Sequence, residues 1–246
     1  MENGLREAIE KIEEMAIKAE VKIFDVHDKK YSTEKLFEIP REYDSPKGIT
    51  LNTLESLADI IKIELEKAYQ PLFVNVKSPT EVNVFSTYHH DENCRRDHIY
   101  YATAELPNII LNQFIEHDSF MIALRSKFVE NEDVTYLLEL LSKITDKNSV
   151  ESEDNGLTQT VQARKGAVLV ENVVVRPKVK LAPFRTFLEV DQPESEFLVR
   201  IQEGGYVGLF EADGGAWKLD AKDNIKEFLM LLLCDEIQAE KVVVIA

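Results

Sequence analysis

The residue types best suited to metal chemistry lie together in one polar segment: His89, His90, Cys94 and His98. Imidazole nitrogens and a thiolate are ligands that Zn²⁺ prefers, and four of them would complete a tetrahedral site. The spacing HHxxxCxxxH, however, fits no established structural zinc pattern, and the segment also carries five charged residues, as a solvated hairpin loop would. These four residues are therefore weak metal candidates, and we expect neither a metal nor a cofactor.

Motifs for other chemistries are incomplete or missing. Residues 151–156 share part of the first half of a calcium-binding loop, but the twelfth position would be Gln162, which has no carboxylate for bidentate binding. The sequence contains no G-x-S-x-G, no Walker A loop and no G-x-G-x-x-G. We therefore predict that the chain is not an enzyme.

Charge is distributed unevenly along the chain. The formal net charge is −16, yet the segment 164–185 holds six basic residues and one acid, a net of +5, which leaves −21 for the remainder. This basic island consists of Arg164, Lys165, Arg176, Lys178, Lys180 and Arg185. Residues 176–180 alternate basic and non-basic positions, so a strand would align the charges on one face. Three interpretations stay open: pairing with local acids, an anion site for a small phosphorylated ligand, or docking onto the acidic surface of an identical subunit.

The elements that position these residues follow from hydrophobic periodicity. Helices and strands come in blocks rather than in strict alternation, which indicates an α+β fold. Residues 1–50 are expected to form an amphipathic N-terminal helix (3–20) and an extended segment with short strands (21–50). The helix either packs on the core of its own chain or acts as an arm that packs on a neighbouring subunit. In the mixed region 51–146, we expect helices at 52–68, 112–128 and 132–146 and strands at 72–77, 80–87 and 97–104. Asn52 and Asn131 are the expected N-caps of the first and third helices.

The polar stretch 147–156 is a candidate hinge. After it, the pattern predicts a β-rich region, 157–246, with strands at 157–163, 167–175, 184–190, 196–203 and 206–211. Asp213-Gly214-Gly215 is a turn signal, and it precedes a helix at 220–235 and a strand at 242–245. These regions could also form one compact domain.

Distinctive blocks occur in this second part of the sequence. They are DNGLTQTV (154–161), LAPFRTFLEVDQPES (181–195), Phe197 with Arg200, and FEADGGAWKL (210–219). In order and spacing, these blocks resemble the YfdQ-type family of phage and prophage proteins over residues 154–219. The resemblance implies a phage or prophage origin and a location in the cytoplasm of a bacterial host. It implies no activity and no catalytic residues.

Polar residues in these blocks stand among apolar strand positions. On one strand, Arg185 and Glu189 would point to the same face. One interpretation is a structural ion-pair network, because buried charges need partners and Arg pairs well with carboxylates. The other is a binding site formed by this face together with Asp213 and Trp217 at the neighbouring turn. Arg200 is a further ligand or interface candidate.

Composition bounds the remaining possibilities. A strongly acidic surface repels phosphate backbones, which argues against bulk nucleic-acid binding. The longest apolar run, Phe228–Cys234, is much shorter than the roughly 20 residues of a membrane span, and the first twenty residues carry six Glu, unlike a secretory signal. Two cysteines are too few for a disulfide framework, so we expect a soluble protein of a reducing compartment.

Three functional hypotheses follow. The first is a phage- or prophage-encoded, non-enzymatic protein that acts through homo-oligomeric assembly, with itself as partner; the terminal helix, the extended segment and the segregated charge motivate it. The second is a binder of a small phosphorylated ligand or of a host protein, which counters a host defence or regulatory step. The third, a metal-dependent enzyme that uses the His/Cys segment, ranks lowest.

Overall fold

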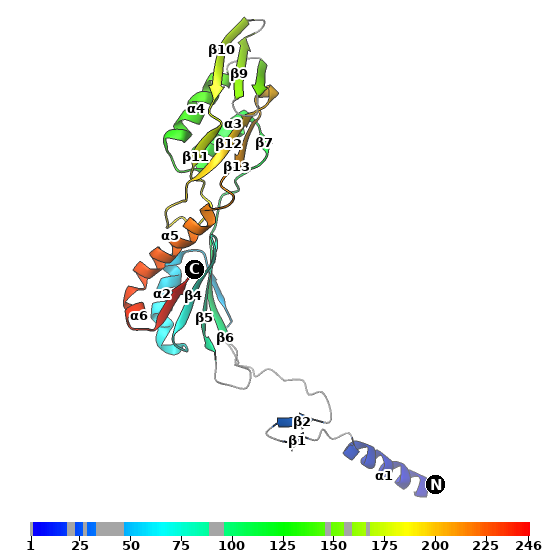
Figure 1. Ribbon diagram of the computed structural model, residues 1–246. Helices are drawn as coiled ribbons and strands as arrows, with labels where there is room; N and C mark the ends of the chain where they lie inside the picture. The colour runs from blue at the N-terminus through cyan, green and yellow to red at the C-terminus, as the bar shows by residue number, and fades with distance from the viewer. Residues whose placement is uncertain are drawn as a thin grey trace. The chain divides into compact units, whose positions relative to one another are not determined.

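The computed structural model describes residues 2–18, 23–26, 29–32, 47–88, 96–145, 149–154, 159–165 and 168–246. The chain divides into two compact units, Met1–Ser45 and Pro46–Ala246, close to the boundary expected at residue 50. Both units combine helix and strand, and the α+β class predicted from the sequence is confirmed (Figure 1). Within the described ranges, no helix is both long and apolar enough to cross a membrane.

The first unit contains a helix and a short hairpin. Helix α1 (Glu2–Lys18) confirms the predicted amphipathic N-terminal helix. Strands β1 (Ile23–Val26) and β2 (Lys29–Ser32) pair in antiparallel fashion, with Phe24 opposite Tyr31. The described side chains of α1, residues 6–15, are all exposed.

A five-stranded sheet with helices on one face forms the first part of the second unit, which we call the five-stranded lobe. Its elements are β3 (Ile49–Leu51), α2 (Leu54–Glu64), the 3-10 turn η1 (Leu65–Lys67), β4 (Leu72–Ser78), β5 (Glu81–Tyr88), β6 (Arg96–Thr103), α5 (Trp217–Leu232), α6 (Cys234–Gln238) and β14 (Val242–Ile245). The strand order is β14-β4-β5-β6-β3, with β14–β4 and β3–β6 parallel and the other pairs antiparallel. The helix expected at 220–235 is thus two helices, α5 and α6.

Buried residues alternate with half-buried ones over residues 72–76 of β4 and 81–87 of β5, so each strand turns one face toward the core. The buried side chains of the sheet meet α2 and α5, which lie on one side of it in Figure 1, and the core includes Leu57, Ile61, Val74, Val84, Ile225 and Leu229. The N-cap of α2 is Thr53, whose hydroxyl accepts a hydrogen bond from the Ser56 N–H at 3.2 Å. The expectation that Asn52 caps this helix was therefore wrong by one residue.

The second part of this unit is inserted between β6 and α5, and we call it the four-stranded lobe. Its elements are β7 (Phe114–Ile115), α3 (His117–Lys127), α4 (Glu132–Thr145), β11 (Lys178–Leu181), β12 (Ser195–Ile201), the 3-10 turn η2 (Glu203–Gly205) and β13 (Val207–Glu211). The sheet has the order β11-β12-β13-β7 and packs against α3 and α4 through its own core, which includes Leu124, Leu137, Leu141, Phe197 and Val199. The predicted cap at Asn131 is confirmed, because its side-chain oxygen accepts from the Val134 N–H at 2.9 Å.

A separate three-stranded antiparallel sheet precedes β11. It consists of β8 (Ser149–Asp154), β9 (Gln159–Lys165) and β10 (Val168–Val175) in the order β10-β9-β8. Residues 149–154 of the candidate hinge therefore form a strand, while 147–148 and 155–156 lie outside the described residues.

The strand expected at 184–190 is not formed, and this prediction was wrong. The connection from β11 to β12 is irregular, and the side-chain amide of Gln192 organises it. The Gln192 oxygen accepts from the N–H groups of Arg185 and Thr186 at 3.0 and 3.3 Å, and its nitrogen donates to the carbonyls of Phe187 and Val190 at 2.9 and 3.1 Å. One side chain thus satisfies the backbone groups that a neighbouring strand would otherwise pair.

Candidate functional site

The best-defined polar cluster in the described residues surrounds Arg185. This residue, on the irregular β11–β12 connection, is buried. Its Nη1 donates to Glu211 Oε1 at 3.0 Å, and its Nη2 donates to Ser195 Oγ at 2.5 Å. Both partners lie on the four-stranded sheet, at the end of β13 and the start of β12. The sequence placed Glu189 on the same face as Arg185, but the carboxylate beside Arg185 in the structure is Glu211.

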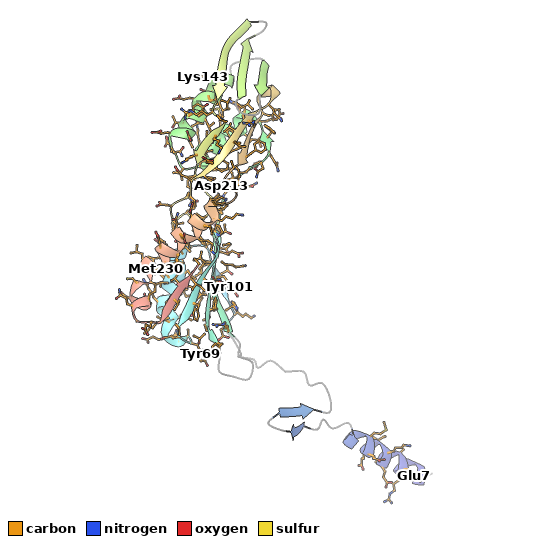
Figure 2. The ribbon with its side chains drawn as sticks, in the orientation of Figure 1. Glu7, Tyr69, Tyr101, Lys143, Asp213 and Met230 are labelled. Carbon is orange, nitrogen blue, oxygen red and sulfur yellow. The ribbon has the colours of Figure 1, made fainter. Side chains whose placement is uncertain are left out.

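The indole of Trp217, the first residue of α5, covers the guanidinium. The Arg185 Cζ lies 3.8 Å from the Trp217 ring centroid, a cation–π contact. Asp213 holds the turn before this helix, because its carboxylate accepts from the N–H groups of Gly215 at 3.0 Å and Trp217 at 3.3 Å. Asp213 lies between the two lobes (Figure 2). The structure therefore brings together three of the four residues of the predicted site.

The electrostatics of this cluster follow from its burial. Desolvation lowers the pKa of Arg185 to about 10, although the charges of Glu211 and Asp213 act in the opposite direction. The guanidinium therefore remains a cation at neutral pH. Its Nε is buried and makes no hydrogen bond within the described part of the chain. Its two terminal nitrogens bond to Glu211 and Ser195, which is the arrangement that the structural interpretation describes.

Glu189 has a different role from the one expected. Its two carboxylate oxygens accept from the backbone N–H groups of Leu54 at 2.9 Å and Glu55 at 2.8 Å, at the start of α2. A carboxylate at a helix N-terminus satisfies unpaired N–H groups and interacts favourably with the helix dipole. The sequence carries no local signal for this contact, since the two segments are 135 positions apart.

The basic island is divided by the fold. Arg176 and residues of β11 line a shallow groove of about 300 Å³ next to the start of α4, whereas Arg185 belongs to the buried cluster. Arg176 Nη1 lies 3.3 Å from Asp133 Oδ1, and its Cζ is 4.2 Å from the Tyr136 ring centroid. The other Asp133 oxygen accepts from the Lys180 backbone N–H at 2.7 Å. Asp133 thus contacts two residues of the basic island, the Arg176 side chain and the Lys180 backbone.

The remaining charges of the groove also have acidic neighbours. Lys178 Nζ lies 2.7 Å from Glu196 Oε2 on the adjacent strand β12. This hydrogen bond, together with the charges of Lys178 and Lys180, lowers the pKa of Glu196 below its usual value. The sequence left three interpretations of the basic island open. The contacts of these described residues support the first, pairing with local acids.

Three other candidates lie on strands β9 and β12. Arg164 and Lys165 lie on β9, and their side chains are outside the described part of the structure. Arg200 lies on β12, where its Nη1 donates to the Val199 carbonyl at 3.0 Å.

The metal hypothesis gains no support from the described residues. His98 is an exposed residue of β6, and its ring lies 5.7 Å from Phe85 and 6.5 Å from Tyr101, measured between centroids. His89, His90 and Cys94 lie outside the described residues. Among the residues that can be placed, no group of three His, Cys, Asp or Glu side chains is arranged to hold a metal ion.

An aromatic surface that sequence reasoning missed lies on the face of the five-stranded sheet opposite α2 and α5. The strand register aligns Val243, Phe73, Phe85 and His98 across four strands. The Phe73 and Phe85 rings stack at 5.5 Å, and the Arg96 guanidinium lies over both, at 5.5 and 5.6 Å. Alternation within each strand is the signal that could have revealed this row, but only the register shows that the residues are neighbours.

Comparisons with known proteins add no functional assignment. The chain matches no family model, no curated protein and no solved structure. The resemblance of residues 154–219 to a phage and prophage family therefore remains a prediction from the sequence blocks, and function has to be argued from the geometry described above.

Proposed function

We propose that this chain is a phage- or prophage-encoded, non-enzymatic protein that works through homo-oligomeric assembly. The observation that carries the proposal is the apolar stripe of α1, where Ile9, Ile12 and Met15 are 50%, 66% and 64% exposed. Large aliphatic side chains at helical spacing are a surface that a partner helix buries.

The length of α1 supports this proposal. A helix of 17 residues is only slightly longer than the roughly 12–15 residues below which isolated helices are marginal in water, and most helical stability in proteins comes from packing. Leu5 and Ile12, like Ala8 and Met15, are seven positions apart, which is the spacing of a coiled-coil seam. Ile9 widens the stripe beyond that seam, and a wider stripe favours a bundle of several helices.

Charge explains why an apolar contact suits this chain. Copies that each carry −16 repel one another at long range, so association needs surfaces poor in acidic groups. Two of the three cations that line the groove, Arg176 and Lys178, pair with acids of their own chain. The stripe of α1 is therefore a stronger basis for assembly than the basic island.

Light scattering coupled to size-exclusion chromatography of the full chain tests the proposal. We expect a wild-type oligomer whose mass falls by a factor of two or more in Ile12→Glu, which places a carboxylate in the stripe. Lys11→Gln is the matched control, because it changes the net charge by the same amount at an exposed neighbouring position and should leave the mass unchanged. A monomeric wild type, or equal masses for all three proteins, would contradict the proposal.

The groove next to β11 favours one second candidate, binding of a small phosphorylated ligand. Three cations, Arg176, Lys178 and Lys180, line it together with two carboxylates, Asp133 and Glu196. A ligand phosphate would have to compete with these carboxylates for the cations. Thermal-shift measurements with inorganic phosphate and nucleotides test this candidate, and no stabilisation by any of them would exclude it.

A further inference from the structure

Among the described strands, β14 forms one edge of the five-stranded sheet, and no described strand pairs with its outer side. In the sheet order it has a single neighbour, β4, and its sequence is Val-Val-Val-Ile. Exposed sheet edges are normally protected from pairing by charged residues, proline, bulges or a covering element. Without such protection, their free N–H and C=O groups pair readily with another strand. No charged residue or proline occurs between Val242 and Ile245. This edge therefore has the properties of an interaction surface.

The hydrogen-bond pattern shows which backbone groups point outward. The Leu72 N–H donates to the Lys241 carbonyl at 2.9 Å, so the backbone of Lys241 faces β4. Backbone groups alternate in direction along a strand, so those of Val243 and Ile245 also face β4. The N–H and C=O groups of Val242 and Val244 then point away from the sheet. Each copy of the chain thus presents two donors and two acceptors along this edge.

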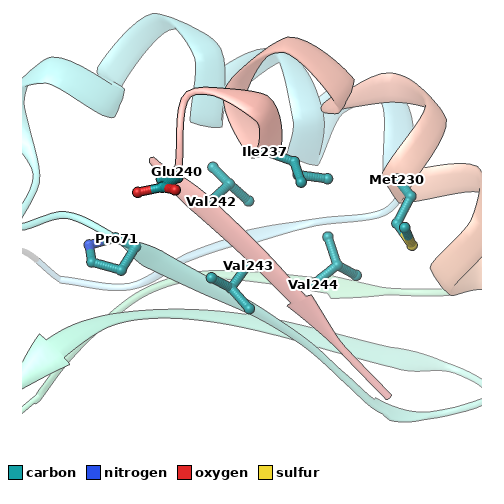
Figure 3. Close-up of a pocket in the computed structure, with 7 residues that line it drawn as sticks. All are labelled: Pro71, Met230, Ile237, Glu240, Val242, Val243 and Val244. Carbon is teal, nitrogen blue, oxygen red and sulfur yellow. The ribbon is translucent and has the colours of Figure 1, made fainter.

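A groove runs along the same edge. It has a volume of about 540 Å³ and is lined by Pro71, Met230, Ile237, Glu240 and residues 242–244. Figure 3 shows Met230 and Ile237 on the helical side of β14, and Glu240 is the one charged lining residue. On the opposite face of the sheet, Val243 and Ile245 are each 38% exposed. The apolar surface at this edge therefore includes both the helical layer and the open face of the sheet.

We infer that two copies of the chain pair their β14 edges in antiparallel fashion about a two-fold axis at Val243, joining two five-stranded sheets into one. This inference rests on the proposed self-assembly and adds a second contact to it. In this register, Val242 of each copy lies opposite Val244 of the other, and each of these pairs exchanges two N–H···O bonds. All the outward groups of both residues are thereby satisfied. Such a contact is isologous, as two-fold interfaces are.

Two properties of the edge favour a second copy over an unrelated extended peptide. A single peptide strand would cover the backbone groups, but not apolar surface on both layers, whereas a second copy brings a sheet edge and a helical layer together. The register also keeps the two Glu240 side chains apart, because Glu240 of each copy lies opposite residue 246 of the other. For a chain with a net charge of −16, an edge strand without acidic residues between Val242 and Ile245 is a surface where two copies meet with less repulsion than elsewhere.

Val244→Pro tests this inference. Proline removes the outward N–H of Val244 and leaves the bonds between β14 and β4 intact, since proline is tolerated where the N–H of an edge strand faces solvent. Val244→Thr keeps both the N–H and the β-branched shape and is the matched control. Both changes are made in the Ile12→Glu chain. In that chain the contact through α1 is lost, and we expect the β14 contact to be the one that remains between copies. We expect Ile12→Glu and Ile12→Glu/Val244→Thr to be dimers, and Ile12→Glu/Val244→Pro to have half their mass.

The outcomes separate this inference from the assembly proposal. If the wild type assembles but Ile12→Glu is already a monomer, the β14 pairing is overturned and assembly through α1 stands. If the wild type is itself a monomer, both fail. Hydrogen exchange of the Val242 and Val244 amides in the Ile12→Glu chain covers the case in which the proline variant misfolds. Slow exchange supports a paired edge, and exchange as fast as in an unfolded chain overturns it.

Discussion

Two arginines of the second unit have the same kinds of neighbours but very different exposure. Arg185 lies 3.0 Å from a Glu211 oxygen and 3.8 Å from the Trp217 ring centroid, and its side chain is 10% exposed. Arg176 lies 3.3 Å from an Asp133 oxygen and 4.2 Å from the Tyr136 ring centroid, with 60% exposure. In the sequence, both belong to one basic island. In the structure, one is a buried polar group and the other is a surface charge.

The difference shows that burial, rather than the list of contacts, determines the energetic role of such a cluster. A solvated ion pair contributes little to the free energy of unfolding, because water and salt screen it. A desolvated guanidinium becomes costly when a partner is removed, because the remaining group is left unpaired. Arg185 also lies next to Thr186, whose hydroxyl donates to the Pro79 carbonyl of the five-stranded lobe at 2.6 Å. Changes at Arg185 therefore affect the contact between the lobes.

Of the changes that test this comparison, Arg185→Leu is expected to have the largest effect on the free energy of unfolding. We expect the free energy of unfolding to fall by about 3 kcal/mol, the lower end of the range for breaking a buried pair, because Glu211 is partly solvated and can be rehydrated. Urea unfolding followed by tryptophan fluorescence measures this directly, since Trp217 stacks on the guanidinium. Arg185→Lys should fall between wild type and leucine, because lysine keeps the charge but loses the planar stack. A loss below about 0.5 kcal/mol would place Arg185 among ordinary surface pairs.

The buried hydroxyl of Tyr100, in the five-stranded lobe, is expected to have an intermediate effect on the free energy of unfolding. Tyr100 is 2% exposed and donates to Glu64 Oε2, and desolvation, followed by the hydrogen bond and charge of Glu64, raises its pKa well above 10. The folded chain therefore keeps this proton at pH values where the unfolded chain loses it. The stabilisation is complete below pH 10 and decreases above it, by at most about 1.4 kcal/mol per pH unit.

Alkaline unfolding curves of wild type and Tyr100→Phe test this prediction. The difference in free energy of unfolding between the two proteins should be constant from pH 8 to pH 9.5, within the range where the unfolded tyrosine keeps its proton. Between pH 10 and pH 11 the difference should become smaller, because only the wild type loses the Tyr100 contribution. Parallel curves over the whole range would show that Tyr100 titrates alike in both states.

Local patterns in the sequence predicted local structure well. Alternating apolar residues located β4, β5 and β6, helical spacing located α1, and Asn131 followed by acidic residues located the start of α4. The turn at Asp213 and the edge strand at 242–245 were also predicted. In each case, the determining interaction lies within a few residues along the chain.

The parts that could not be predicted depend on contacts between distant segments. Phe187 belongs to the core of the five-stranded lobe, although Phe197, ten positions later, belongs to the core of the four-stranded lobe. The apolar residues around Phe187 therefore pack without forming the strand expected at 184–190. Glu189 was expected on the same strand face as Arg185, whereas it binds the N-terminus of a helix far earlier in the chain. Arg185, Asp213 and Trp217 lie close together, as expected, because the turn was predicted independently of the strand. Glu189 lies elsewhere, because its expected position depended on the missing strand.

The smallest expected effect is at Arg176. Arg176→Ala should lower the free energy of unfolding by no more than about 1 kcal/mol, because the pair with Asp133 is largely exposed and the ring contact with Tyr136 is also at the surface. Most of that loss should disappear in about 1 M salt, where the screening length falls to about 3 Å. The cost of Arg185→Leu should change little under the same conditions, since its pair is shielded from ions. Urea unfolding of both variants at low and high salt compares the two sites directly. If the two losses depended equally on salt, burial would not be what distinguishes these arginines.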